Sequence, residues 1–150
     1  MTTVVGYSQE QIIDLMQVIP FFETFTLYEK KRMASFQGGF VTYGPGTRII
    51  TEGKKDTSFY ILLTGKVVTV KQGAEINIMD KGEVFGEMAF FANSDRSTSV
   101  VAQESVFLFR FNQESLQKLG CEIREKIKDQ CILKMIKRVE KLTERLRVRM

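Results

Sequence analysis

The feature that most constrains this chain is the regular return of glycine between short apolar runs, from about residue 36 to residue 112. The turn signals lie about 8 to 12 residues apart, the interval typical of antiparallel barrels and jelly rolls. They are Gly44-Pro45-Gly46, Glu52-Gly53, Thr64-Gly65, Gln72-Gly73 and Lys81-Gly82. The runs between them are rich in β-branched and aromatic residues, which favour strands. Strands are therefore predicted at residues 40–43, 59–63, 66–70, 76–79, 99–102 and 106–109.

Helices are expected on both sides of this strand-rich segment. Ser8 with Gln11, and likewise Thr26 with Glu29, fit the capping box that begins a helix. Pro20 separates the two helices that they would begin. After residue 112 glycine nearly vanishes, which predicts a helical segment to near the end of the chain. We therefore divide one structural domain into an N-terminal helical segment (1–35), a β-barrel core (36–112) and a C-terminal helical segment (113–150).

The chain contains no histidine, which removes Ser-His and Cys-His nucleophilic catalysis and histidine-ligated metal centres. Cys121 and Cys131 fall in the C-terminal helical segment, in which only Gly120 is a break. Ten positions of helix separate the two thiols too far for a disulfide, so both are expected to be reduced. We expect no metal site, no catalytic residues and no enzymatic activity.

The charge and the apolar runs bear on partners and location. The net charge is +4, and the basic residues concentrate after residue 118. Such a segment fits a solvated helix face better than a nucleic-acid surface, so DNA is not an expected partner. The sequence contains no run of about 18 apolar residues, so it predicts no membrane span. Residues 1–5 have neither the basic start nor the apolar stretch of a secretory leader. We therefore expect a cytoplasmic protein.

Residues 82–100 do not fit a simple strand. Glu87 to Ala92 is compatible with a helix but too short to fold alone, which predicts one helical turn between two strands. Such a turn presents backbone N–H groups at its start, where Gly86 allows an anion to approach closely. Arg96 follows Glu87 by nine positions. An arginine fork suits a cyclic phosphate, a carboxylate suits a ribose hydroxyl, and apolar strands suit a base.

Two motifs make this segment specific. Phe85-Gly86-Glu87-Met88-Ala89, followed after a gap by Arg96-Ser97-Thr98-Ser99-Val100, resembles the phosphate-binding cassette of the cyclic-nucleotide-binding domain family. That family includes cAMP-receptor proteins, cyclic-nucleotide-gated channels and protein kinase A regulatory subunits. The similarity covers about residues 15 to 140. It implies a mainly β fold with flanking helices: an antiparallel β jelly-roll barrel with N-terminal helices, a short phosphate-cassette helix and a long C-terminal helix.

The resemblance also implies roles for individual residues. Arg96 would pair with the cyclic phosphate, and Glu87 would accept a hydrogen bond from the ribose 2′-hydroxyl. Ser97 favours cAMP over cGMP, because threonine at that position tends to accompany cGMP. Asp95 and Thr98 depart from the proline and alanine that are frequent there. The expected ligand-binding residues are Phe85, Gly86, Glu87, Met88, Ala89, Arg96, Ser97 and Thr98. No cofactor is expected besides the ligand, which is cAMP or, as the second choice, cGMP.

The function that the resemblance implies is a regulatory sensor for signal transduction. The nucleotide enters the barrel, and the C-terminal helix moves to cover its base, with Lys134, Lys137 or Arg138 as the covering residue. The helix would then signal to an effector domain or protein. A homodimer formed through the same helix is the other possible partnership. The alternative is a protein-interaction scaffold of the same fold with a non-functional pocket. A DNA-reading regulator is disfavoured, because no helix-turn-helix fits after the long helix.

Three further expectations concern packing. Arg96 could instead be a surface residue paired with Asp95. Met88, Phe90 and Phe91 are expected in the core and against the long helix. An apolar stripe on the predicted C-terminal helix spans barely two heptads, so we expect it to pack on its own domain rather than form a coiled coil. The stripe consists of Cys131, Met135, Val139, Leu142 and Leu146.

Overall fold

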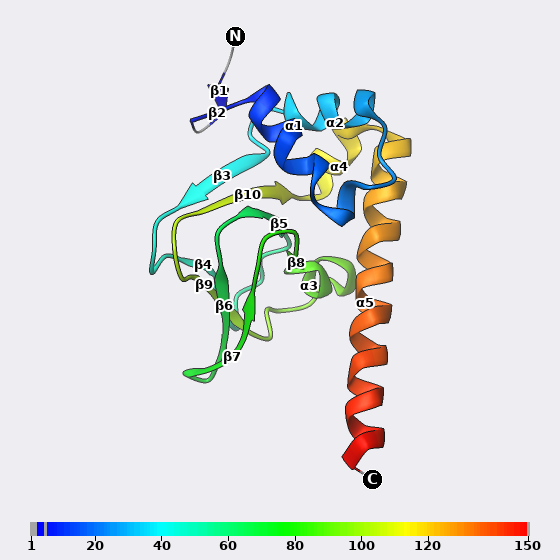
Figure 1. The fold of residues 1–150 in the computed structure, drawn as a ribbon. Helices are drawn as coiled ribbons and strands as arrows, with labels where there is room; N and C mark the ends of the chain where they lie inside the picture. Colours follow the sequence, from blue (N-terminus) through cyan, green and yellow to red (C-terminus); the bar gives the residue numbers. More distant parts are fainter. Residues whose placement is uncertain (1–2, 5, 150) are drawn as a thin grey trace.

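The computed structural model describes residues 3–4 and 6–149. Short helices cover one end of a strand-rich body, and a long helix runs down one side of it (Figure 1). The strands are β1 (Thr3–Val4), β2 (Tyr7–Ser8), β3 (Phe40–Tyr43), β4 (Arg48–Ile50), β5 (Phe59–Thr64), β6 (Val67–Lys71), β7 (Ala74–Met79), β8 (Val84–Phe85), β9 (Ser99–Ala102) and β10 (Val106–Phe111). The helices are α1 (Gln9–Gln17), the 3₁₀ turn η1 (Pro20–Phe22), α2 (Leu27–Ala34), α3 (Glu87–Ala92), α4 (Gln113–Leu119) and α5 (Cys121–Arg149).

The strands form two four-stranded antiparallel sheets and one separate pair. One sheet has the order β3-β10-β5-β8, the other has the order β4-β9-β6-β7, and β1 pairs with β2. The mainly β fold with flanking helices and a long C-terminal helix is thus confirmed. The expected jelly-roll barrel is observed only as two sheets, because the described strands are not hydrogen-bonded into one closed ring.

The first sheet is buried on both faces. Side chains alternate along its strands, so each strand contributes to a core on either side. Along β5, Tyr60 and Leu62 join the core between the two sheets. Phe59, Ile61 and Leu63 of the same strand face the helices instead. This explains why residues 59–63 read as a continuous apolar run rather than as an alternating one.

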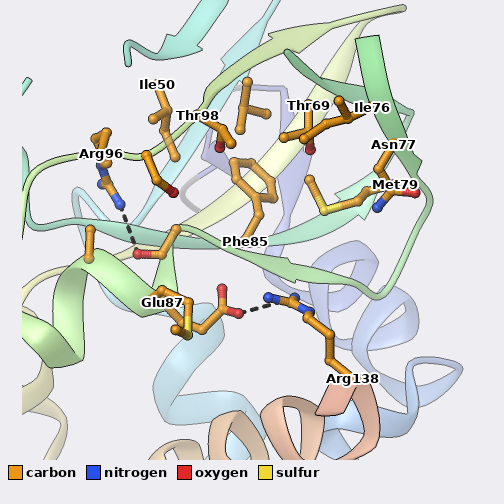
Figure 2. A pocket seen from close by; sticks show the side chains of 15 residues that line it. Ile50, Thr69, Ile76, Asn77, Met79, Phe85, Glu87, Arg96, Thr98 and Arg138 are labelled. Atoms are coloured by element: carbon orange, nitrogen blue, oxygen red, sulfur yellow. Dashed lines mark hydrogen bonds and ion pairs between the residues drawn. The ribbon is translucent and has the colours of Figure 1, made fainter. Parts of the chain in front are cut away.

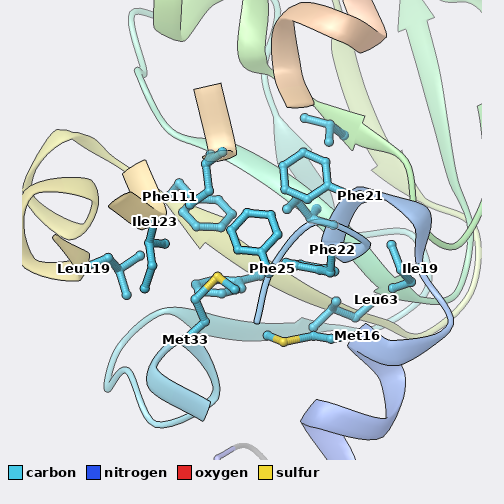
Figure 3. Packing of buried hydrophobic residues seen from close by; sticks show 14 of the residues in the cluster. Met16, Ile19, Phe21, Phe22, Phe25, Met33, Leu63, Phe111, Leu119 and Ile123 are labelled. Atoms are coloured by element: carbon cyan, nitrogen blue, oxygen red, sulfur yellow. The ribbon is translucent and has the colours of Figure 1, made fainter. Parts of the chain in front are cut away.

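The core on the helix side joins distant parts of the chain. Phe22 and Phe25 gather there with Phe111 of β10 and Ile123 of α5 (Figure 3). Burying a phenylalanine side chain contributes about 1.5–3 kcal/mol. The cluster therefore fixes the first part of α5 against the N-terminal helices and the sheet.

The predicted helix starts are confirmed. The side chains of Ser8 and Gln11 cap α1 reciprocally, and those of Thr26 and Glu29 do the same for α2. Pro20 opens η1 between these two helices. Each reciprocal cap satisfies backbone N–H groups that lack a partner within their helix, which is why the sequence marked these positions correctly.

Helices follow residue 112, as the loss of glycine predicted, with Gly120 between α4 and α5. Cys121 is exposed and Cys131 is buried, and both are free thiols on α5. Lys126 ties this helix to α2 through an ion pair of 2.6 Å with the buried carboxylate of Glu29. None of the described helices has a stretch long and apolar enough to cross a membrane.

The sequence did not predict β1, β2, β4 and β8. These strands are two or three residues long, and so short a run shows no alternation. The predicted boundaries at 40–43 and 99–102 are confirmed as drawn. Residues 1, 2, 5 and 150, on which the leader assessment and the outer segment boundaries partly rest, lie outside the described residues.

Candidate functional site

A pocket of about 290 Å³ opens where α3, the loop before β9, the β6-β7 pair and α5 meet (Figure 2). Ile76, Asn77 and Met79 of β7 and Thr69 of β6 form part of its wall. Its volume lies at the lower end of the range found for small-molecule sites. All eight residues that the sequence singled out line this pocket: Phe85, Gly86, Glu87, Met88, Ala89, Arg96, Ser97 and Thr98.

Arg96 is the buried positive charge of the pocket, with 4% of its surface exposed. Its backbone N–H donates to the Lys54 carbonyl at 2.9 Å, which fixes the loop. Nη1 donates to the Gly86 carbonyl at 2.8 Å, and Nη2 donates to the Ser58 carbonyl. Nη2 also lies 3.4 Å from the Asp56 carboxylate. Nε is buried and has no hydrogen-bond partner, so the guanidinium is held in place while its Nε–H remains unsatisfied.

Glu87, the first residue of α3, is the buried negative charge, with 2% of its surface exposed. Its Oε1 lies 3.2 Å from Nη2 of Arg138, which reaches toward it from α5 (Figure 2). This contact is an ion pair without hydrogen-bond geometry. Within residues 3–4 and 6–149, Glu87 Oε1 and Arg96 Nε are the two buried side-chain atoms that lack a hydrogen-bond partner. Glu87 Oε1 lacks a hydrogen-bond donor, and Arg96 Nε lacks a hydrogen-bond acceptor.

Gly86 contacts both charged residues, because it precedes Glu87 in the chain and its carbonyl accepts a hydrogen bond from Arg96. Its φ of 84° lies in the left-handed region, which glycine adopts without steric cost. A Cβ at this position would lie 3.0 Å from Nη1 of Arg96 and 3.1 Å from Cδ1 of Ile50. Glycine is therefore required both for the backbone turn and for the close approach of the guanidinium.

α5 packs against the pocket through residues on one of its faces. Burial, followed by the charge of Glu87, raises the pKa of the Cys131 thiol to about 12. Burial lowers the pKa of Lys134, whose ammonium donates to the Gly82 carbonyl at 3.2 Å. Lys137 is exposed. Of the three lysine and arginine candidates on this helix, Arg138 is the one that lines the pocket.

The alternative that placed Arg96 at the surface beside Asp95 is wrong. Asp95 is exposed, whereas Arg96 is buried and pairs with Asp56. The sequence did not single out Asp56 as a site residue. Its one local signal is the hydrogen bond that Oδ1 accepts from the Ser58 N–H at 3.1 Å, the pattern of an Asx turn. Asn77 was missed as well, because no motif marks its strand.

The expected burial of the α3 apolar cluster is wrong in part. Phe90 is buried, but Met88 is 56% exposed and Phe91 is 37% exposed. A single helical turn on the surface can bury only one of its faces. Phe90 occupies that face and packs edge-on against Phe59 of β5.

The expected packing of the α5 stripe on its own domain is also wrong in part. Cys131 is buried, but Val139, Leu142 and Leu146 are exposed. The helix continues past α3 along the side of the sheets, and its outer side meets no other described element (Figure 1).

The model of the cyclic nucleotide-binding domain family matches residues 40–120, which is more than half of the chain. The chain is 30% identical over 108 residues to a cAMP-dependent protein kinase regulatory subunit of Pyricularia oryzae. That alignment covers 71% of this chain and 27% of the relative. The chain thus spans about a quarter of the length of the regulatory subunits that it matches.

Solved structures share the fold. A cyclic nucleotide-binding domain from Methylobacillus flagellatus has a TM-score of 0.75 at 21% identity, covering 95% of this chain and 84% of the other. The regulatory subunit of a cAMP-independent protein kinase A from Trypanosoma brucei has a TM-score of 0.69 at 25% identity, covering 87% of this chain and 46% of the other. Together with the match over residues 40–120, these similarities show that the chain belongs to the cyclic nucleotide-binding domain family.

Proposed function

We propose that this chain is a cyclic-nucleotide-binding regulatory module that prefers cAMP to cGMP and has no catalytic role. One observation carries the proposal: Arg96 and Glu87 are buried charges of opposite sign that line one pocket, and each retains an unpartnered buried atom. A phosphate oxygen would accept from Arg96 Nε, and a ribose hydroxyl would donate to Glu87. An unsatisfied buried polar group costs about 1–3 kcal/mol, so a ligand that satisfies both gains affinity.

The remaining pocket residues fit the other parts of a nucleotide. Backbone N–H groups near Gly86, Ala89 and Ser97 would surround the phosphate, because the first N–H groups of a helix have no partner within it. The base would rest against the apolar side chains of Ile76 and Met79 on β7. Planar, largely apolar bases are held in this way by apolar walls with a few polar groups at their edges.

Two pocket residues support cAMP over cGMP. Ser97 stands where threonine tends to accompany cGMP in the family. Asn77 lines the pocket on β7, and its amide both donates and accepts. An asparagine amide pairs with the N6 donor and N7 acceptor of adenine, whereas guanine presents two acceptors on the same edge.

We further propose that two parts of the chain have different roles. Residues 36–112 hold the nucleotide, and residues 113–150 transmit its arrival. Arg138 on α5 pairs with Glu87, so a ribose hydroxyl that engages this carboxylate changes the contact that holds α5. The signal is limited to the difference in nucleotide affinity between the two positions of α5. The recipient would be an effector domain or protein, as the name of the Pyricularia oryzae regulatory subunit suggests for that relative.

The second candidate is a scaffold whose pocket binds no nucleotide. The internal pairing of the site favours it, because the Arg96 guanidinium already donates to the Gly86 and Ser58 carbonyls and Glu87 already pairs with Arg138. The Trypanosoma brucei structure, which is a cAMP-independent kinase subunit by name, has the same fold.

Calorimetric and thermal-shift titrations with cAMP, cGMP and 5′-AMP separate the two candidates. The sensor predicts saturable heat with cAMP, weaker binding of cGMP, and a melting temperature that rises with cAMP concentration. The open phosphate of 5′-AMP is the control, because it lacks the cyclic diester. Absent heat and an unchanged melting temperature at millimolar cAMP would leave the scaffold as the function.

A further inference from the structure

The β6–β7 hairpin forms one wall of the pocket. Thr69 of β6 and Asn77 of β7 are direct cross-strand partners, and both line the pocket. The register then shifts toward the hairpin turn, which leaves Ile76 as an extra residue of β7. A bulge of this kind re-aims side chains, so the chain neighbours Ile76 and Asn77 both line the pocket. We call Thr69, Ile76 and Asn77 the hairpin wall, and Figure 2 shows it across the pocket from Arg96.

The residues that would hold the phosphate lie on a separate segment. We call residues 93–98, between α3 and β9, the arginine loop. Arg96, Ser97 and Thr98 of this loop line the pocket. A nucleotide that filled the pocket would touch the arginine loop with its phosphate and the hairpin wall with its base. Its affinity would therefore depend on how firmly these two segments are held at a fixed distance.

Lys71, the last residue of β6, joins the hairpin directly to the arginine loop. Backbone pairing between β6 and β9 ends at Val70 and Ser99, so the sheet itself does not hold the loop. The Nζ of Lys71 donates to the Ser97 carbonyl at 3.2 Å. This bond carries a full positive charge on its donor, which makes it stronger than one between neutral groups. It continues the attachment of the hairpin at the point where the strand pairing stops.

Glu52 joins the same two parts of the molecule from the other side of β9. Its backbone N–H donates to the hydroxyl of the buried Ser99 at 2.9 Å. Its Oε1 accepts a hydrogen bond from the Gln72 N–H at 3.1 Å. In the sheet, β9 lies between β4 and β6, and Glu52 follows β4. The carboxylate therefore bridges the start of β9 and reaches the tip of the hairpin.

The tip of the hairpin is a rigid point of attachment. Lys71 pairs with Ala74, so Gln72 and Gly73 form a two-residue turn. Their φ values of 51° and 82° both lie in the left-handed region, as a type I′ turn requires. The first N–H of such a turn has no partner within the hairpin, and Glu52 supplies one.

We propose that Lys71 and Glu52 are positioning residues, which hold the arginine loop against the β6–β7 hairpin and so fix the distance between the phosphate and base subsites. This inference rests on the proposed nucleotide site, but neither residue lines the pocket. The loop has a second attachment that does not involve them. The Gly53 N–H donates to the Arg96 carbonyl at 2.8 Å, and the Arg96 N–H donates to the Lys54 carbonyl at 2.9 Å. Removing both positioning side chains should therefore loosen the phosphate subsite from the base subsite and leave the phosphate subsite itself intact.

Affinities for cAMP and for ribose 3′,5′-cyclic phosphate, measured by competition against radiolabelled cAMP, test the proposal. Lys71→Met with Glu52→Ala should weaken cAMP binding about 5- to 10-fold, as expected for the loss of two exposed hydrogen bonds. Ribose 3′,5′-cyclic phosphate has no base to touch the hairpin wall, so its affinity should change by less than about twofold. Lys71→Arg with Glu52→Gln keeps a donor and an acceptor and should bind cAMP like wild type.

The matched control removes another lysine–glutamate pair. Lys118→Met with Glu114→Ala deletes an exposed ion pair on α4, and it should leave both affinities unchanged. The melting temperature of each unliganded chain shows whether that variant folds.

Hydrogen exchange reports the same contacts without any nucleotide. In Lys71→Met with Glu52→Ala, the Gln72 N–H loses its acceptor. Exchange at residues 72–74 and 97–98 should therefore rise severalfold, whereas amides of β5 should exchange as in wild type.

Equal losses of affinity for the two ligands would overturn the proposal, because the effect would then lie in the phosphate subsite itself. Unchanged cAMP affinity or unchanged exchange in Lys71→Met with Glu52→Ala would overturn it as well, and would leave the proposed function standing if wild type binds cAMP. A wild-type chain that binds no cAMP would overturn both the proposed function and this inference.

Discussion

At the scale of single residues, the site depends on two charges that the fold buries and holds. Burying an unpaired charge costs several kcal/mol, so each must be compensated within the protein. Arg96 is compensated by Asp56 and two backbone carbonyls, and Glu87 is compensated by Arg138. Because their backbones are also fixed by α3 and by the loop before β9, neither side chain needs a large rearrangement to meet a ligand. The proposed site is thus pre-organised, which would lower the entropic cost of binding a nucleotide.

Glu87→Gln tests the ribose contact. Replacing the carboxylate should weaken cAMP binding by about 1.5–3 kcal/mol, the range for hydrogen bonds to charged groups. The same substitution should leave the affinity for 2′-deoxy-cAMP nearly unchanged, because that analogue has no hydroxyl to donate. Calorimetric titration of cAMP and of 2′-deoxy-cAMP into wild type and into Glu87→Gln measures all four affinities. Glu83→Gln, outside the pocket lining, is the control. Equal losses for the two nucleotides would assign Glu87 a purely structural role.

At the scale of the elements, α5 has two halves with different attachments. Ile123, Ile127 and Cys131 anchor the first half in the helix-side core. Further along, Lys134 and Arg138 are the polar contacts that the helix makes with the pocket region. A firmly packed first half and a second half held by two polar contacts are what the proposed movement of α5 requires, because the outer part could then shift without unfolding the domain.

Arg138→Ala should uncouple α5 from the pocket. In wild type, cAMP should change the hydrogen-exchange rates of amides in residues 132–148, since the ligand alters the Glu87–Arg138 pair. In Arg138→Ala that change should shrink severalfold, while protection at residues 86–98 persists. Arg145→Ala, an exposed arginine on the same helix, should behave like wild type. An unchanged α5 response in Arg138→Ala would show that the signal takes another route.

The anchor of α5 predicts a dependence of stability on pH. Burial opposes ionisation of Glu29, but hydrogen bonds from Lys126 and Thr26 outweigh it and hold the pKa of this carboxyl below its usual 4.5. A carboxyl with a lowered folded pKa stabilises the fold above the unfolded value and loses that contribution as the pH falls through the folded value. Glu29→Gln should therefore cost about 1–3 kcal/mol near neutral pH and much less once the pH has fallen below the lowered pKa of the folded state.

Thermal melts at neutral and acid pH measure this difference. The melting temperatures of wild type and Glu29→Gln should converge as the pH falls, whereas Glu10→Gln, an exposed carboxyl on α1, should follow wild type throughout. A constant gap between wild type and Glu29→Gln would mean that the charge of Glu29 does not contribute.

At the scale of the whole molecule, the sequence predicted the features that depend on a few adjacent residues. These features are the capping boxes, the glycine turns, the α3 turn and the positions of Glu87 and Arg96. The Asp56 to Arg96 pair could not be predicted, because 40 positions separate its members. The sequence marked Cys131, Met135, Val139, Leu142 and Leu146 as an apolar stripe, but periodicity identifies an apolar face without specifying what covers it. The strands of two or three residues carry no period at all.

The central claim is that Arg96 and Glu87 together form one nucleotide site, and the affinity of Arg96→Ala for cAMP tests it most directly. A calorimetric titration should show a loss of about 2–4 kcal/mol relative to wild type, because the buried phosphate would lose its charged partner. The melting temperature of the unliganded variant reports any loss of the contacts to Ser58 and Gly86 separately. An affinity equal to that of wild type, in a variant that remains folded, would contradict the claim.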